Sequence, residues 1–126
     1  VMAVSPEEIG IIRRIHASDL SLEDMLRYTE GEDLDLVLLE GFHMKTSDRR
    51  DVYKIVSAKG ERELSQTMKD VSPPILAIIG PIARNDAKAD MYVPVLDLET
   101  ERNLLARIVE EQVLRRERSR RIQVTD

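Results

Sequence analysis

Apolar and polar positions fall into blocks along this chain, and the stretch Asp33–Phe42 organises the others. It holds an apolar run that is bounded on one side by Asp35 and on the other by Glu40. A short continuous apolar run predicts a strand buried on both faces, as in a parallel sheet flanked by helices. We therefore expect this strand to lie inside an α/β fold.

A strand and two helices are expected before this stretch. The apolar opening Val1–Val4 predicts a strand, and Ser5–Glu8 follows it with the serine, proline and glutamate of a helix start. Ser21–Asp24 predicts a second helix start, and Gly31 is a suitable end for that helix. The predicted inward positions are Ile9, Ile12 and Ile15 in the first helix, and Leu22, Met25 and Leu26 in the second.

Strands and helices alternate through the rest of the chain, which predicts an α/β fold with a mainly parallel sheet flanked by helices. Pro94 makes its short strand either an edge strand or a strand that starts at the proline. The expected elements are a polar loop at His43–Asp51, a strand at Asp51–Ser57, a helix within Ala58–Asp70 with Leu64 and Met68 inward, a strand at Ile75–Ile79, a polar loop at 84–90, a strand at Val93–Leu96 and a long helix from Glu99 to about Arg121.

Composition narrows the class of protein. The 126 residues fit a single domain, 1–126, and with one Phe, three Tyr and no Trp the core must be aliphatic. The absence of cysteine excludes disulfides and thiolate metal sites. The formal net charge of −5 argues against nucleic-acid binding, and no apolar run approaches the roughly 18 residues that span a membrane, so we expect a cytoplasmic protein.

The carboxyl end of the predicted central strand is the first candidate site. Ligands of open α/β sheets bind at the carboxyl ends of the strands, so Glu40 is expected to face the chemistry. Gly41 follows it and permits a sharp turn or the close approach of a ligand. The alternative for Glu40 is an acid that simply leaves the sheet into solvent.

Four segments of the chain resemble, in order, the strands of one known family. Asp35–Phe42 is similar to that family's DLVLVEGF strand, and this segment alone is distinctive. Tyr53–Val56 is similar to its PKIEV strand, although the proline before the lysine is missing here. Ile75–Ile79 and Val93–Asp97 match the last two strands in order and spacing. The family is MobB, the GTP-binding P-loop adaptor proteins of molybdopterin-guanine dinucleotide biosynthesis, and the resemblance covers about residues 1 to 110.

One motif of that family, the phosphate-binding loop G-x-x-x-x-G-K-[ST], is absent from these 126 residues. In P-loop proteins this loop supplies the backbone N–H groups and the lysine that hold the phosphates. Two accounts stay open. Either the sequence is the C-terminal part of a longer protein, which its apolar opening favours, or it is a relative that works without the loop and together with a partner.

The resemblance implies a partial P-loop NTPase-like fold and a role for one acid. Glu40 would hold nucleotide-bound Mg²⁺, directly or through water, which is adequate because Mg²⁺ usually takes one or two carboxylates together with phosphates and waters. The resemblance also implies GTP as ligand, molybdopterin and the molybdenum cofactor guanylyltransferase as partners, and a homodimer. We assign no catalytic residue and expect weak GTP hydrolysis at most. The alternative is an α/β interaction or adaptor protein that binds no nucleotide.

Basic and polar residues give further candidates. Lys45, Arg49, Arg50 and Lys54 form a basic cluster that suits a pterin phosphate or a guanine nucleotide, or else they form a solvated loop. His43 directly follows the Glu40–Phe42 motif and is a candidate ligand contact.

The last candidates lie in a loop and in the C-terminal tail. Asn85 and Asp86 follow the Ile75–Ile79 strand, where nucleotide-binding folds of this type commonly read the base. Five arginines make the tail either a surface for nucleic acid or an acidic partner, or an exposed helix end that complements the helix dipole. No aromatic residue is interleaved with them, which weakens the nucleic-acid alternative. They are Arg115, Arg116, Arg118, Arg120 and Arg121.

Overall fold

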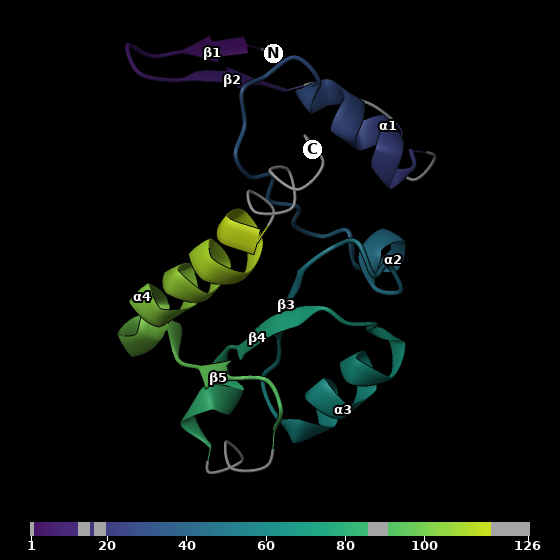
Figure 1. Ribbon diagram of the computed structural model, residues 1–126, viewed down its shortest axis with the longest axis vertical. Coiled ribbons are helices and arrows are strands. Elements are labelled where there is room, and N and C mark those ends of the chain that lie inside the picture. Colours follow the sequence, from purple (N-terminus) through teal and green to yellow (C-terminus); the bar gives the residue numbers. More distant parts are fainter. Residues whose placement is uncertain (1, 13–15, 17–19, 86–90, 117–126) are drawn as a thin grey trace, which may run out of the picture. The chain divides into compact units, whose positions relative to one another are not determined.

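The chain divides into two compact units, Val1–Asp33 and Leu34–Asp126 (Figure 1). The computed structural model describes residues 2–12, 16, 20–85 and 91–116. The single domain expected from the chain length stays a prediction. Within these described ranges, no helix has both the length and the apolar character needed to cross a membrane.

The first unit opens with an antiparallel hairpin. It consists of β1 (Met2–Val4) and β2 (Ile9–Ile11). The strand expected at the start of the chain is therefore confirmed. The paired residues are Met2 with Ile11, Ala3 with Gly10 and Val4 with Ile9.

The helix predicted to begin at Ser5 is wrong, because this serine serves a turn. Its hydroxyl accepts hydrogen bonds from the backbone N–H of Glu7 at 3.4 Å and of Glu8 at 3.0 Å. The backbone N–H of Ser5 donates to the carbonyl of Glu8 at 2.8 Å and closes the hairpin loop. Serine hydroxyls satisfy turns as well as helix ends, and the β-branched residues on both sides favour strands. Ile15, predicted to point inward from that helix, lies outside the described residues.

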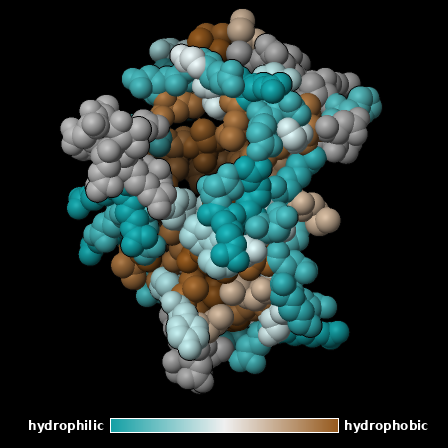
Figure 2. All heavy atoms as spheres, turned by 45° about the vertical axis from the view of Figure 1, so that its right-hand side comes forward, coloured by the Kyte–Doolittle hydropathy of each residue, from teal (hydrophilic) through white to brown (hydrophobic). Residues whose placement is uncertain are grey.

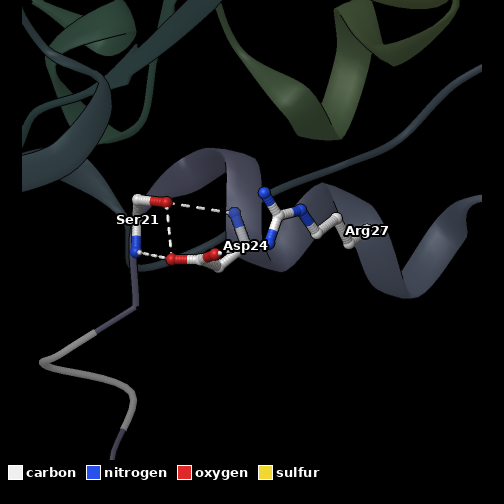
Figure 3. A network of polar contacts seen from close by, with 3 residues as sticks. All are labelled: Ser21, Asp24 and Arg27. Carbon is white, nitrogen blue, oxygen red and sulfur yellow. Dashed lines mark hydrogen bonds and ion pairs between the residues drawn. The ribbon is translucent and has the colours of Figure 1, made fainter.

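Helix α1 (Leu22–Leu26) begins where the sequence predicts. The Ser21 hydroxyl accepts from the backbone N–H of Asp24 at 3.0 Å, and the Asp24 carboxylate accepts from the backbone N–H of Ser21 at 3.1 Å (Figure 3). Arg27 donates to the other oxygen of the same carboxylate at 3.3 Å. This reciprocal pair is a capping box, which satisfies backbone donors that the first helical turn leaves open.

The predicted inward face of α1 is confirmed only in part. Leu22 is buried and Met25 is half-buried, but Leu26 is 37% exposed. The 3₁₀ helix η2 (Arg27–Thr29) continues the chain. Gly31 then adopts a φ of 87°, which is the conformation expected of a glycine that ends a helix.

The second unit is built on a parallel sheet of three strands in the order β3-β4-β5. They are β3 (Lys54–Ser57), β4 (Ile75–Ile79) and β5 (Val95–Leu96). All three strands were predicted, although β3 and β5 are shorter than expected. Both β3 and β5 are edge strands of this sheet, so the edge position suggested by Pro94 is confirmed.

One cluster of buried side chains lies on one face of the sheet. Val56, Ile78 and Val95 are register partners across the three strands, so their side chains share that face. Leu64 packs on them from α3 (Glu61–Asp70), as predicted. The remaining members of this cluster are Ala58, Ile82 and Ala83, with Met68, Val71, Ile75, Met91 and Val93 packed against it.

Helix α4 (Leu98–Val109) flanks the sheet against β4 and β5, with α3 on the other side in Figure 1. It continues as the π-helix η5 (Glu110–Arg115), so the long C-terminal helix is confirmed as far as the structure describes it. Residues 117–121, which the prediction included, lie outside the described residues. The mixed α/β class with a parallel sheet flanked by helices is therefore confirmed.

The buried central strand is the main error of the sequence analysis. The stretch Asp33–Phe42 has no regular secondary structure, and four of its apolar residues are exposed, while Leu39 and Phe42 are half-buried. An apolar run becomes a buried strand only if strands on both edges and helices on both faces enclose it. The three-stranded sheet does not include this stretch. The exposed fractions are 52% for Leu34, 41% for Leu36, 38% for Val37 and 83% for Leu38.

Candidate functional site

The carboxyl ends of β3, β4 and β5 meet at one edge of the sheet, which is where ligands of open parallel sheets bind. The residues that follow the strands there are Ala58, Gly80 and Asp97. The backbone N–H of Ala58 donates to the carbonyl of Ile79 at 3.0 Å, and the N–H of Ile82 donates back to the Ala58 carbonyl at 3.3 Å. The ends of β3 and β4 are therefore held together by their own backbone.

Gly80 is required by this close arrangement. Its φ of 108° and ψ of −171° lie in a region that only glycine adopts readily. A Cβ placed on Gly80 would lie 2.6 Å from the carbonyl oxygen of Ala58. The glycine thus serves packing between two strand ends.

An ionic cluster occupies the end of β5. Arg84, the last residue of η3 (Pro81–Arg84), donates from Nε to Asp97 at 3.1 Å and from Nη2 to Glu99 at 2.7 Å. Asp97 also caps α4 by accepting from the backbone N–H of Glu99 at 3.0 Å. The hydrogen bonds to Glu99 and Asp97 raise the pKa of Arg84 above its usual value. Asp97 is thus engaged by two donors and joins η3 to the start of α4.

Sequence reasoning missed this cluster although a signal was present. Asp97 directly follows a buried strand, which is the same pattern that pointed to Glu40. The helix that begins after Asp97 marks the aspartate as a helix cap as well. The contribution of Arg84 had no such signal, because it depends on how η3 returns to the sheet.

Glu40 and Gly41 lie in the irregular stretch before α2, and no strand ends at either residue. The Glu40 side chain is exposed, and no hydrogen bond or ion pair joins it to another described residue. Gly41 has a φ of 79°, so the backbone turn predicted here is present. A Cβ on Gly41 would meet nothing within 4 Å, so nothing in this structure approaches it closely.

His43 and Lys45 lie in a short helix and not in the predicted polar loop. This helix is α2 (His43–Thr46), and the Thr46 hydroxyl donates to the carbonyl of Phe42 at 2.9 Å. His43 is exposed and Lys45 is half-buried. The backbone N–H of Ser72, two residues before Pro74, donates to the carbonyl of Ser47 at 2.7 Å, which ties the end of α2 to the amino end of β4.

Arg49 is occupied by its own neighbour. It donates from Nε and Nη2 to the two oxygens of Asp51, at 2.9 Å and 2.6 Å. These hydrogen bonds lower the pKa of Asp51 from 3.8 to about 2. A guanidinium paired in this bidentate way has less capacity for an anionic ligand. Arg50, the next member of the predicted basic cluster, is exposed.

Lys54 is the first residue of β3, and its side chain is directed into the protein. It is 9% exposed, and its ammonium donates to the backbone carbonyls of Arg49 and Val52, to the latter at 3.0 Å. Burial lowers the pKa of Lys54 from 10.5, and the charges of Asp51 and Asp48 oppose that shift. The lysine predicted to contact a ligand is thus used inside the fold.

The structure does not bring the predicted site residues together. Lys45, Arg49 and Lys54 belong to the elements at the amino end of the sheet, whereas exposed Asn85 follows η3 beyond the carboxyl end of β4. Asp86 lies outside the described residues. Amino and carboxyl ends of parallel strands are opposite edges of one sheet, so these residues cannot form one pocket.

The described residues do not fit a complete site for Mg²⁺ and a nucleotide. No group of three or more His, Cys, Asp or Glu side chains among them could hold a metal ion. Asp97, at the edge where phosphates would be expected, is taken by Arg84. Glu40 remains as an exposed acid that belongs to no such group among the described residues. The metal role of Glu40 stays a prediction.

Comparison of the chain with protein-family models, with curated proteins and with solved structures found no match.

Proposed function

We propose that this chain is a nucleotide-binding accessory protein of molybdenum cofactor biosynthesis, of the kind the MobB family provides. One observation carries the proposal. The three segments that resemble the later strands of that family, around Tyr53–Val56, Ile75–Ile79 and Val93–Asp97, supply the three neighbouring parallel strands of the sheet. Parallel sheets flanked by helices are a common scaffold for nucleotides, which supports a P-loop NTPase-like fold as part of the proposal.

In this proposal the described sheet serves as the scaffold, and the phosphates are bound elsewhere. The 126 residues contain no G-x-x-x-x-G-K-[ST] loop, so residues other than these would hold the phosphates. Glu40 is the acid of this chain assigned to nucleotide-bound Mg²⁺. Its support is the resemblance of Asp35–Phe42 to the DLVLVEGF strand, together with a carboxylate that has no partner among the described residues. Asn85 remains a candidate for contact with the base.

The proposed cellular role follows the same resemblance. The protein would work in the cytoplasm as a homodimer and would present GTP with Mg²⁺ to the molybdenum cofactor guanylyltransferase, which joins a guanine nucleotide to molybdopterin. No side chain of this chain is assigned as a general base or nucleophile. GTP hydrolysis by the protein itself would be weak.

Calorimetric titration of Mg²⁺-GTP tests the proposal. The titration uses the product of the complete reading frame that encodes these residues, first unchanged and then as Glu40→Ala. We expect the substitution to weaken binding about 10- to 100-fold, the range typical of losing a metal ligand or its support. Glu32→Ala is the control, because Glu32 is also an exposed acid and should leave affinity unchanged. Tight binding that Glu40→Ala does not alter would reject the role of Glu40, and no binding would reject the proposal.

A second candidate, an interaction protein that binds no nucleotide, is favoured by the exposed apolar stretch. Leu34, Leu36 and Leu38 are between 41% and 83% exposed, and apolar side chains reach the surface between polar ones in Figure 2. Apolar surface of this kind often marks a protein interface. We take the guanylyltransferase as its partner.

Binding to the guanylyltransferase without nucleotide separates the two candidates. If the second holds, immobilised transferase retains the protein in the absence of GTP, and Leu38→Ser reduces that retention at least tenfold. Tyr92→Ser is the control, because Tyr92 is fully exposed outside the stretch. Retention that requires Mg²⁺-GTP, or that Leu38→Ser leaves unchanged, contradicts the second candidate.

A further inference from the structure

Lys54 is the one buried charged residue among those the structure describes, and it lies where the sheet begins. Its backbone N–H donates to the carbonyl of Pro74 at 3.0 Å, which brings β3 to the amino end of β4. The strand register is irregular at this point, because Lys54 pairs with Ile75 whereas Ile55 pairs with Ala77. The residue therefore marks the place where β3 joins the sheet.

The ammonium of Lys54 also closes the segment that leads into β3. Its two acceptors are the backbone carbonyls of Arg49 and Val52, which lie within one short loop. A buried ammonium is tolerated only when its protons are donated to acceptors, and these carbonyls provide them. In return, the loop that carries Arg49 is fixed to the strand.

Burial lowers the pKa of the Lys54 amine, and nearby carboxylates oppose that shift. Asp51 and Asp48 are close enough to favour the charged amine electrostatically. Arg49 directs its guanidinium to Asp51 and gives only its carbonyl to the lysine. The cation, the two carbonyls and the Arg49–Asp51 pair thus form one connected polar group at the amino end of β3.

We propose that Lys54 is a latch, an internal cation that holds residues 49–53 closed against the amino end of β3 and sets the register in which β3 joins β4. The latch accounts for a lysine that is buried although lysine is almost never buried without partners. It also removes Lys54 from the residues that could neutralise a ligand phosphate. The inference goes beyond the proposed function, because it holds whether or not the protein binds a nucleotide.

Competitive acetylation of the folded, unsubstituted chain tests the latch directly. Lys59 and Lys69 are exposed and serve as internal controls. With a limiting amount of an acetylating reagent, followed by mass spectrometry of peptides, we expect the Lys54 amine to react at least tenfold more slowly than either control, because it must first leave its carbonyls. Reaction of Lys54 as fast as Lys59 would overturn the proposal.

Hydrogen exchange of substituted chains supplies the second measurement. In Lys54→Met the stem is kept and the ammonium is lost, so the N–H of residue 54 and the N–H of Arg49, bonded to the Thr46 carbonyl at 3.2 Å, should exchange at least tenfold faster. The N–H of Ile78, bonded to the Pro94 carbonyl at 2.9 Å, should change much less. Lys59→Met is the matched control and should leave all these amides as they were. Unchanged protection at residue 54 in Lys54→Met would refute the latch.

The acetylation experiment also separates this inference from nucleotide binding. With the product of the complete reading frame, saturating Mg²⁺-GTP should leave the Lys54 rate unchanged. A rate that falls on addition of Mg²⁺-GTP would show that the amine meets the nucleotide, and the latch would be wrong. Failure of GTP to bind at all would contradict the proposed function and leave the Lys54 rate as expected here.

Discussion

Replacement of Gly80 by alanine should destabilise the second unit strongly. Gly80 directly follows β4 with a φ of 108° and a ψ of −171°, and the Cβ of an alanine would lie 2.6 Å from the carbonyl oxygen of Ala58. That oxygen also accepts from the backbone N–H of Ile82 at 3.3 Å. The obstructing atom belongs to the backbone, so a side-chain rotation cannot relieve the contact.

Two costs add in the Gly80→Ala chain. A backbone conformation essentially confined to glycine costs on the order of 1–3 kcal/mol for another residue. Moving packed backbone to accept one more methyl group costs about another 1–3 kcal/mol, as overpacked cores do. The free energy of unfolding should therefore fall by roughly 2–6 kcal/mol, a large share of the 5–15 kcal/mol typical of a domain.

Urea denaturation followed by circular dichroism measures this loss. With a slope of about 2 kcal/mol per molar urea, the midpoint should fall by roughly 1–3 M. Gly60→Ala is the matched control, because Gly60 has an extended φ of −167° and its Cβ would meet nothing within 4 Å. Gly60 is the residue that caps the start of α3, so Gly60→Ala should lower the free energy of unfolding by no more than about 1 kcal/mol. A Gly80→Ala midpoint equal to that of Gly60→Ala would refute the reasoning.

Three further outcomes are expected. Ile78→Ala, at a fully buried position, should lower the free energy of unfolding by about 2–5 kcal/mol in urea denaturation. Ile55→Ala, at a position 36% exposed, should lower it clearly less. Equal losses would contradict the assigned core. Arg49 lowers the pKa of Asp51 to about 2, so the contribution of Asp51 to stability is fully present above pH 3.8 and is lost as the pH falls through about 2. The difference in the free energy of unfolding between the unsubstituted chain and Asp51→Asn should therefore shrink over that window. A difference that is constant from pH 5 to pH 2 would argue against the Arg49–Asp51 pair. Ser21→Ala should cost about 1 kcal/mol locally, seen as faster amide exchange in α1, and unchanged exchange would deny the capping box.

Elements whose partners lie close in sequence were predicted well. The β3–α3–β4 succession follows from alternation in Asp51–Ser57, from the spacing of Leu64 and Met68, and from the apolar Ile75–Ile79. Local periodicity alone is enough to predict each of these elements and the face that it buries. The capping box at Ser21 is local as well, and it was found.

Errors arose where a pattern has two physical solutions. Ser5 with acids after it satisfies a turn as readily as a helix start, and only the pairing of β1 with β2 decides between them. The run within Asp33–Phe42 reads as a buried strand, but whether it is buried depends on which strands flank it. Periodicity does not carry that information.

The candidate site was predicted less well, because contacts among side chains decide it. Sequence spacing suggested that Arg49 and Lys54 belong to a basic cluster, but it could not show that Asp51 and two backbone carbonyls take up their donors. It also could not show that Arg84 returns to Asp97 after η3. The sequence shows which charged residues are present, whereas the fold determines which of them are already paired with one another.

The exposed leucines at the start of the second unit, Leu34, Leu36 and Leu38, have a consequence for handling the protein. A short segment with high strand propensity and bare apolar side chains is a template for cross-β stacking between molecules. Asp33, Asp35 and Glu40 bracket this segment as gatekeepers, since stacked copies would bring like charges together. Solubility should therefore depend on the repulsion between those negative charges, and it should fall when concentrated salt screens that repulsion.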